Sequence, residues 1–434
     1  MLGENMFSDF EFDCVFLIGN ENITGHLKYN INGIFDFNNQ SFQNGANRWS
    51  FLHAIGLKLD CDKIINKHFF GAVKDQTNLK VSIFYPHSHM SGPESIEDAL
   101  NELPTKNFTD CTSELMIIGN DKHYSYLDSY SNPVFDDVML EFKNMFNVPY
   151  GKDFLIANDC PKLRFVNNSI GSISSTCLHM KFIEPVGFQL LRKFISKFQD
   201  FFTVVCGRPK YISKIFSMHD NNPYFLMYRQ IRFDEYEYNR IDANLGFDTM
   251  IILENFDQIV DSWFIKNISN QYFVDFFLMA QYFNMYTPIK YLYFLESLNC
   301  YFNKKEFNNT SEYMTDFMQK RFYKESEGLG TRIEYLFTKF IIEMKIKNFI
   351  SHEFIKKIKN TRDYMAHAGA FTDQDKETFK PQYLFLINDL LLLVNSYCIF
   401  KELELENDVI KKWMQNKLEL TIGQLSHCDI ISKQ

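Results

Sequence analysis

The spacing of hydrophobic residues changes along the chain and separates it into two parts. In the first part, residues 12–85 contain short segments in which apolar and polar residues alternate, as in ITGHLKYNINGIFDFN, with Gly or Asn in the gaps. Alternation with such breaks is typical of strands joined by turns. We expect further strands at 55–59, 69–73, 79–85, 113–119, 211–216 and 224–233. Their spacing predicts an antiparallel sheet or sandwich.

One strong helix interrupts this pattern. Its apolar residues recur at helical spacing and form a single stripe: Leu191, Phe194, Ile195, Phe198, Phe201 and Phe202. A stripe of this kind predicts an amphipathic helix, and Gly207 and Pro209 should end it. The strands and this helix together predict a mainly β N-terminal module.

After about residue 256 every strong signal is helical. We expect helices over 268–285, 288–302, 311–325, 331–347, 352–368 and 383–403. The fold class predicted for the whole chain is therefore multi-domain α+β, with a sandwich-like module over 1–255 followed by an all-α bundle over 256–434. Alternatively, the N-terminal module consists of two subdomains with a boundary near residue 150.

Composition narrows the class of protein. The 434 residues make a single core improbable and favour two or three domains. The 46 Phe and 23 Tyr supply enough apolar area for a folded protein. A net charge of -9 argues against a protein that coats nucleic acid by bulk charge. The nine cysteines are scattered without a C-x2-C pair, as expected for buried thiols in a reducing compartment.

Two segments bear on localisation. The first residues, MLGENMFSDFEFDC, lack the basic start of a signal peptide. The apolar run 383–400 is interrupted by Asn388, Asp389 and Asn395, where a membrane would penalise polar groups most. We expect a cytoplasmic protein without membrane association, in which this run is buried in a bundle or a dimer interface.

Motifs of common enzyme classes give little support for a metal site, a nucleotide-binding site or a serine hydrolase. His87 and His89 form an H-x-H pair, but PHSHMSGP resembles a loop flanked by Pro and Gly, and no third metal ligand follows at a diagnostic spacing. The chain contains no P-loop, no dinucleotide-binding glycine motif and no G-x-S-x-G elbow. We therefore expect no cofactor and no metal. Metal-dependent hydrolysis remains the alternative that would use the two histidines.

A compact polar cluster stands out in the helical half: Arg362, Asp363 and His367. Arg362 and His367 are separated by four residues and form an R-x4-H pattern, with the polar Asp363 in second position. Such a pattern matches by chance about once in a chain of this size. Arg48 and His53 form a second copy, which is assigned to chance because Trp49 fills the second position. Asp363 and His367, four residues apart, share a helix face.

Local positive charge accompanies the cluster. The lysines Lys356, Lys357 and Lys359 lie just upstream and offer a patch that could hold phosphate. Glu296, within the apolar segment YLYFLESL, is either a polar side chain that reaches the cluster or a solvated position. Arg332 is expected to be a surface or inter-helix partner rather than a phosphate ligand.

The order of these segments resembles the ApeA-like HEPN domain. The resemblance rests on YLYFLESLNCYF (291–302), LGTRIEYLFTKF (329–340), KNTRDYMAHAG and then YLFLINDLLLLVNSYCIFKEL. The N-terminal half is similar to the ApeA-type N-terminal domain through GHLKYNINGIFDF, FFGAVKD and FQLLRKFISKFQDFFTVVCGRP. Each motif alone is weak, and the specificity comes from their order.

The resemblance implies an anti-phage protein that acts by abortive infection as a metal-independent endoribonuclease toxin, with tRNA one candidate substrate. It implies a homodimer whose two motif helices share a cleft, with a higher oligomer left open and a phage-derived trigger as a partner. Arg362 would hold the scissile phosphate, His367 would transfer a proton, and Asp363 stands where the family most often has Asn. The other reading is a non-catalytic HEPN scaffold that binds RNA or a partner protein.

Overall fold

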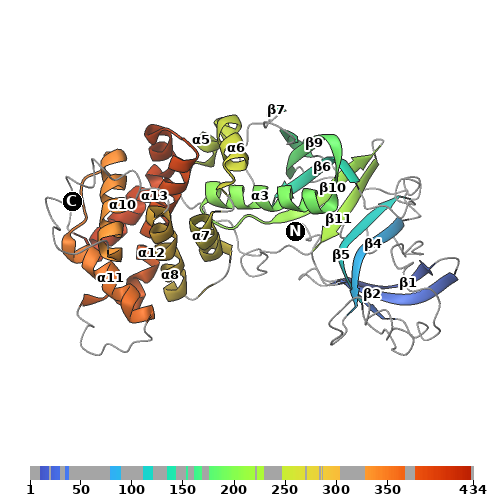
Figure 1. The fold of residues 1–434 in the computed structure, drawn as a ribbon, viewed down its shortest axis with the longest axis horizontal. Coiled ribbons are helices and arrows are strands. Elements are labelled where there is room, and N and C mark those ends of the chain that lie inside the picture. The colour runs from blue at the N-terminus through green and yellow to red at the C-terminus, as the bar shows by residue number, and fades with distance from the viewer. Residues whose placement is uncertain are drawn as a thin grey trace. The chain divides into compact units, whose positions relative to one another are not determined.

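The computed structural model describes the following parts of the chain (Figure 1): residues 10–18, 21–29, 35–38, 79–88, 111–120, 134–142, 153–154, 161–168, 175–219, 222–228, 247–268, 271–282, 285, 287–303, 328–366 and 377–431. The chain forms two compact units. Unit 1 comprises Met1–Phe146, Tyr150–Ser196 and Tyr211–Glu235, and unit 2 comprises Asn147–Pro149, Lys197–Lys210 and Tyr236–Gln434.

Unit 1 contains two antiparallel sheets. A three-stranded sheet has the order β1-β2-β3, and an eight-stranded sheet has the order β4-β5-β11-β10-β6-β9-β8-β7. Their strands are β1 (Phe10–Ile18), β2 (Glu21–Tyr29), β3 (Phe35–Asn38), β4 (Leu79–Ser88), β5 (Cys111–Asn120), β6 (Val134–Phe142), β7 (Asp153–Phe154), β8 (Lys162–Asn168), β9 (Ser175–Gly187), β10 (Ile212–His219) and β11 (Asn222–Tyr228).

The middle of the larger sheet carries the apolar core of unit 1. Along β6 the residues Val138, Leu140 and Phe142 are buried at every second position, as the pleat of a strand requires. The following helix, α3 (Phe188–Cys206), adds buried residues from its first half. Phe194 packs against Phe182 of β9, with ring centroids 5.5 Å apart. A mainly β module with one strong helix is thus confirmed.

Helix α3 begins in unit 1 and ends in unit 2. In its second half, the backbone oxygen of Lys197 accepts a hydrogen bond from Trp263 Nε1 at 3.1 Å, and the ring of Phe201 packs edge-on against the same tryptophan. The helix ends at Gly207, whose φ of 65° is left-handed and whose missing Cβ leaves room for the ring of Phe247. The predicted end of this helix is confirmed.

Unit 2 is helical. Its helices are α5 (Thr249–Glu254), α6 (Phe256–Ile265), α7 (Tyr272–Tyr282), α8 (Thr287–Tyr301), α10 (Leu329–Glu343), α11 (His352–Ala366), the short 3-10 helix η8 (Pro381–Tyr383), α12 (Leu384–Glu402) and α13 (Asn407–His427). Helix α12 contacts α7, α8, α10 and α13 and forms the centre of the bundle (Figure 1).

The apolar run around α12 is a core helix. Pro381–Glu402 is long and apolar enough to cross a membrane, but 83% of its most apolar window is buried inside the protein. The two asparagines that interrupt the run bind the backbone of α8: Asn388 Nδ2 donates to the oxygen of Thr287 at 3.1 Å, and Asn395 Nδ2 to that of Phe294 at 3.2 Å. The predicted burial is confirmed, and these polar residues join two helices.

Some sequence expectations need correction or lie outside the described residues. His87 was placed in a loop, but it belongs to β4, opposite Thr112 of β5. Pro86 does not end the strand because β4 is the edge of its sheet, where a missing backbone N–H is tolerated. The expected strands at 55–59 and 69–73, the helix at 311–325, and Arg48, His53 and His89 all lie outside the described residues. The domain boundary at residue 255 stays a prediction.

Candidate active site

Helix α11 carries Arg362 and Asp363 of the predicted cluster and is amphipathic. Its buried residues are Phe354, Ile355, Ile358 and Thr361, which follow a helical repeat and face the bundle. The Oγ of Ser351 accepts a hydrogen bond from the backbone N–H of Phe354 at 3.1 Å and caps the first turn. Because Arg362 and Asp363 follow directly after Thr361, the helix presents them half-buried at the edge of this packed face.

Both terminal nitrogens of the Arg362 guanidinium are hydrogen-bonded to carboxylates. Nη2 donates to Oε1 of Glu296 on α8 at 2.9 Å, and Nη1 donates to Oδ1 of Asp363 at 3.3 Å. These contacts raise the pKa of Arg362, with the hydrogen bond to Glu296 the largest cause. The arginine is therefore charged and oriented by two helices.

The hydrogen bonds continue from Glu296 to α10. Glu296 Oε2 accepts a bond from Asn299 Nδ2 at 3.3 Å, and Asn299 Oδ1 accepts one from Arg332 Nη1 at 2.8 Å. The Arg332 guanidinium lies 5.9 Å from the centroid of the Phe302 ring. Arg332 is an inter-helix partner, as expected. We call the set Asp363, Arg362, Glu296, Asn299 and Arg332 the arginine network.

Sequence reasoning did not single out Asn299, nor Tyr291 below the network. The spacing of Asn299, one helical turn after Glu296, is the signal that could have found it. The buried hydroxyl of Tyr291 donates to the backbone oxygen of Ile358 at 2.7 Å. Burial raises the pKa of Tyr291 well above its ordinary value, and the charge of Asp363 adds to the shift. A neutral phenol thus joins α8 to α11 beneath the cluster.

The three predicted lysines differ in their surroundings. Lys356 Nζ donates to Glu377 Oε1 at 2.7 Å, and Asn360 Nδ2 donates to the other oxygen of Glu377 at 2.8 Å. Lys356, with Asn360, lowers the pKa of Glu377. Lys357 is half-buried, whereas Lys359 is exposed. Lys359 precedes Arg362 by three residues, which places the two on neighbouring positions of the helix surface.

His367 lies outside the described residues, so its distance to Arg362 stays a prediction. The described chain leaves α11 at Ala366 and resumes at Glu377. Beyond Glu377, the backbone N–H of Phe379 donates to Oγ1 of Thr361 at 2.9 Å, and Thr361 is only 1% exposed. The described chain that follows the segment containing His367 is therefore attached to α11.

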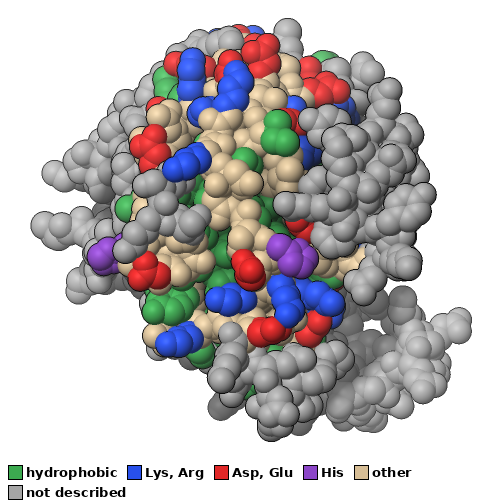
Figure 2. All heavy atoms as spheres, turned by 90° about the vertical axis from the view of Figure 1, so that its left-hand side faces the viewer, with side chains coloured by type: hydrophobic (Ala, Val, Ile, Leu, Met, Phe, Trp, Pro, Cys, Tyr) green, Lys and Arg blue, Asp and Glu red, His purple; other side chains and the backbone are tan. Residues whose placement is uncertain are grey.

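The surface around these helices is mixed in charge. Figure 2 shows the side of the molecule where α10 and α11 lie in Figure 1, with Lys and Arg side chains interspersed with Asp and Glu. Arg362 pairs with both Glu296 and Asp363, and Lys356 pairs with Glu377. Within the described ranges, no group of three His, Cys, Asp or Glu side chains is arranged to hold a metal ion.

A comparison with protein families places this site within a known domain. Residues 282–409 match the family model described as Apea-like HEPN. The comparisons with curated proteins and with solved structures found no match. The matched range contains α8, α10, α11 and α12, and with them every member of the arginine network.

Proposed function

The chain contains an Apea-like HEPN domain over residues 282–409, and from this premise we propose that it is a metal-independent endoribonuclease of anti-phage abortive infection. The family points to an RNA-related nuclease function. The observation that carries it is the half-buried Arg362, charged and held by hydrogen bonds from two helices of the matched domain.

Arg362 would bind the scissile phosphate. A guanidinium is planar, stays protonated, and matches two phosphate oxygens at once, so it stabilises the charge that grows in a pentavalent transition state. Glu296 and Asp363 fix its plane before substrate arrives. Lys359, exposed on a neighbouring position of the helix, would contact a flanking phosphate together with Lys357, while Lys356 would first have to leave Glu377.

His367 would transfer the proton. The 2'-hydroxyl oxygen attacks phosphorus as an imidazole takes its proton, and the bond from phosphorus to the 5'-oxygen breaks as that oxygen gains a proton. The products are a 2',3'-cyclic phosphate and a 5'-hydroxyl, and no water or metal ion enters the balance. Imidazole suits both proton transfers near neutral pH, and the two protomers of a homodimer would supply the two histidines.

The test compares purified wild-type protein with Arg362→Ala and His367→Ala on RNA that includes tRNA, with EDTA present. We expect cleavage by wild type and a loss of at least a hundredfold, on the order of 3 kcal/mol, in each variant. The second R-x4-H pair supplies matched controls, because Arg48→Ala and His53→Ala should cleave like wild type. Equal cleavage by the Arg362 and His367 variants would refute the nuclease proposal. Loss with EDTA and dependence on His87 and His89 would favour metal-dependent hydrolysis.

A non-catalytic scaffold that binds RNA or a partner protein is the second candidate. It is favoured by one observation, that both terminal nitrogens of Arg362 are already occupied by carboxylates. In that case RNA bound in a gel-shift assay would remain intact, and Glu296→Gln would strengthen binding without producing fragments.

The biological setting is proposed together with the reaction. A cytoplasmic toxin released by a phage-derived trigger, sensed through the β-rich module, should limit phage growth at the cost of the infected cell. Cells carrying the wild-type chain should show fewer plaques than cells carrying Arg362→Ala at equal protein level. Equal plaque counts would contradict the anti-phage role, and they would not affect the outcome of the in vitro cleavage test.

A further inference from the structure

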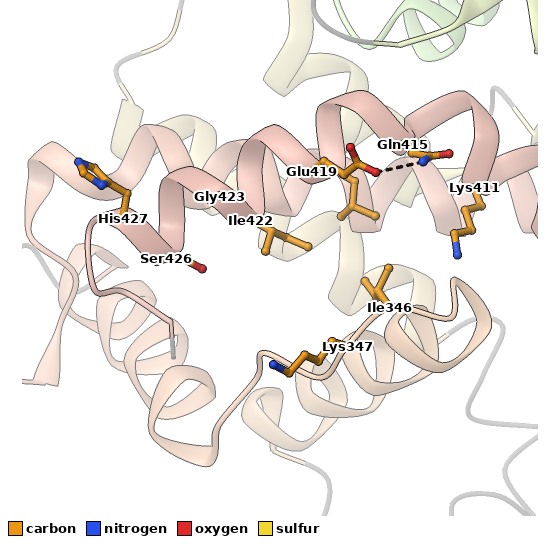
Figure 3. A pocket seen from close by; sticks show the side chains of 10 residues that line it. Ile346, Lys347, Lys411, Gln415, Glu419, Ile422, Gly423, Ser426 and His427 are labelled. Atoms are coloured by element: carbon orange, nitrogen blue, oxygen red, sulfur yellow. Dashed lines mark hydrogen bonds between the residues drawn. The ribbon is translucent and has the colours of Figure 1, made fainter. Parts of the chain in front are cut away.

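A groove separate from the arginine network lies between α13 and the chain that follows α10. Its volume is about 670 Å³, and Figure 3 shows α13 on one side of it and Ile346 and Lys347 on the other. It is lined by Ile346, Lys347, Lys411, Gln415, Leu418, Glu419, Ile422, Gly423, Ser426 and His427. Arg332 is in the first turn of α10 and Ile346 lies just past its end, so the groove and the network are about 20 Å apart at 1.5 Å per residue.

The groove offers cations around an apolar centre. Lys347 and Lys411 both line it, and neither has an ion-pair partner among the described residues. The one acidic lining residue, Glu419, accepts a hydrogen bond from Gln415 at 3.0 Å. Leu418 and Ile422 of α13 contribute apolar lining, and Figure 3 shows Ile422 opposite Ile346. The lining therefore suits a ligand that carries both negative charge and an apolar part.

Two further details concern the surface of α13 along the groove. The hydroxyl oxygen of Ser426 is buried and has no hydrogen-bond partner, although buried polar groups are nearly always satisfied. Figure 3 shows this side chain directed toward the groove. A Cβ added at Gly423 would meet no atom within 4 Å, so the helix surface at this glycine is open to a bound molecule.

From these observations we propose that the groove binds a nucleoside diphosphate or a closely related small phosphorylated ligand. The phosphates would contact Lys347 and Lys411, and the base would lie on Ile346 and Ile422. The volume lies within the range of small-molecule sites. A long polyanion fits less well, because the exposed Asp408 and Asp429 lie near the two ends of α13.

The binding test uses ADP as the probe in calorimetric titrations of the full chain. We expect saturable 1:1 binding, at least tenfold weaker binding to Lys411→Glu and Lys347→Glu, and at least tenfold weaker binding of adenosine than of ADP. Lys412→Glu is the matched control, because Lys412 is the next residue on α13, is exposed and does not line the groove. This control should bind ADP within about twofold of wild type.

A second variant tests the place of binding without removing charge. Gly423→Leu should fill the groove and abolish ADP binding, and Gln424→Leu, one residue further on the same helix and outside the lining, should not. A thermal melt of Gly423→Leu at or above that of wild type excludes misfolding, since leucine favours a helix over glycine.

Three results would overturn the proposal: no saturable binding of ADP, ADP binding that Lys411→Glu and Gly423→Leu leave unchanged, or adenosine binding as tightly as ADP. A short RNA that binds the groove where ADP does not would replace it with a polynucleotide site. None of these results bears on the cleavage test at Arg362, so the two proposals fail independently.

Discussion

Arg362 has an orientation that its neighbours impose. Its two terminal nitrogens bond to Glu296 and Asp363, and Glu296 is itself held by Asn299. The side chain of Arg362 is 31% exposed, so water screens these charges only in part. An arginine fixed in this way loses little freedom when it binds a phosphate, provided that its outward edge faces the substrate.

We therefore predict that Glu296→Ala slows RNA cleavage by roughly tenfold to a hundredfold, because a released guanidinium no longer keeps one orientation. Single-turnover rates would measure this effect. Glu296→Gln, which retains an oxygen acceptor, should recover part of the rate, and Asn299→Ala should lose less than Glu296→Ala. Cleavage by Glu296→Ala that is faster than wild type would mean that Glu296 restrains the arginine.

At the scale of elements, the site depends on how three helices meet. Helical periodicity in the sequence predicts α8, α10 and α11, but it does not determine which faces pack together. The contacts that align them are buried and specific, such as the hydroxyl of Tyr291 on the backbone oxygen of Ile358. The chain from Glu377 onward is attached to α11 through Glu377 and Phe379. These attachments can be tested separately.

The contact between Glu377 and Lys356 makes stability depend on pH. Lys356 lowers the pKa of Glu377 in the folded protein, so the carboxylate stabilises the fold above the pKa of the unfolded chain and loses this effect as the pH falls through the folded value. Wild type should exceed Glu377→Gln in melting temperature above roughly pH 5, and the difference should shrink on acidification. A difference that grows toward low pH would contradict the assignment.

An ion pair between Lys417 and Asp389 joins α13 to α12, and replacing either residue should lower the stability by a different amount. Lys417 is 8% exposed and its Nζ lies 2.6 Å from Oδ2 of Asp389, whose side chain is 31% exposed. Asp389→Ala leaves a buried ammonium without a partner and should cost about 2–3 kcal/mol. Lys417→Met leaves a carboxylate that reaches water and should cost about 1 kcal/mol or less. Equal losses in denaturant unfolding would show that the pair is not effectively buried.

At the scale of the whole molecule, the chain combines a β-rich unit with a helical one. Helix α12 is buried within its own bundle, so of the two roles expected for the apolar run, core helix or dimer contact, the core role accounts for most of its surface. The homodimer stays a prediction, and other surfaces of the HEPN domain would form it.

We predict that the protein forms a dimer and that RNA cleavage requires this dimer. Light scattering after gel filtration should give twice 51.5 kDa, and activity per protomer should fall on dilution below the dimer dissociation constant. A strictly monomeric protein with full activity would contradict a site built from two protomers.

The sequence by itself determined the change from period-2 to helical patterning, the positions of α3, α8, α10, α11 and α12, and the position of the R-x4-H copy between apolar helices. These features are local, because strand and helix periodicities follow from backbone geometry. Tertiary structure decided what the polar residues contact. It brought Glu296 to Arg362, 66 positions further along the chain, paired Lys356 with Glu377, and placed His87 in an edge strand. Such contacts depend on which helix faces meet and on how the strands pair, and packing of the whole chain sets both.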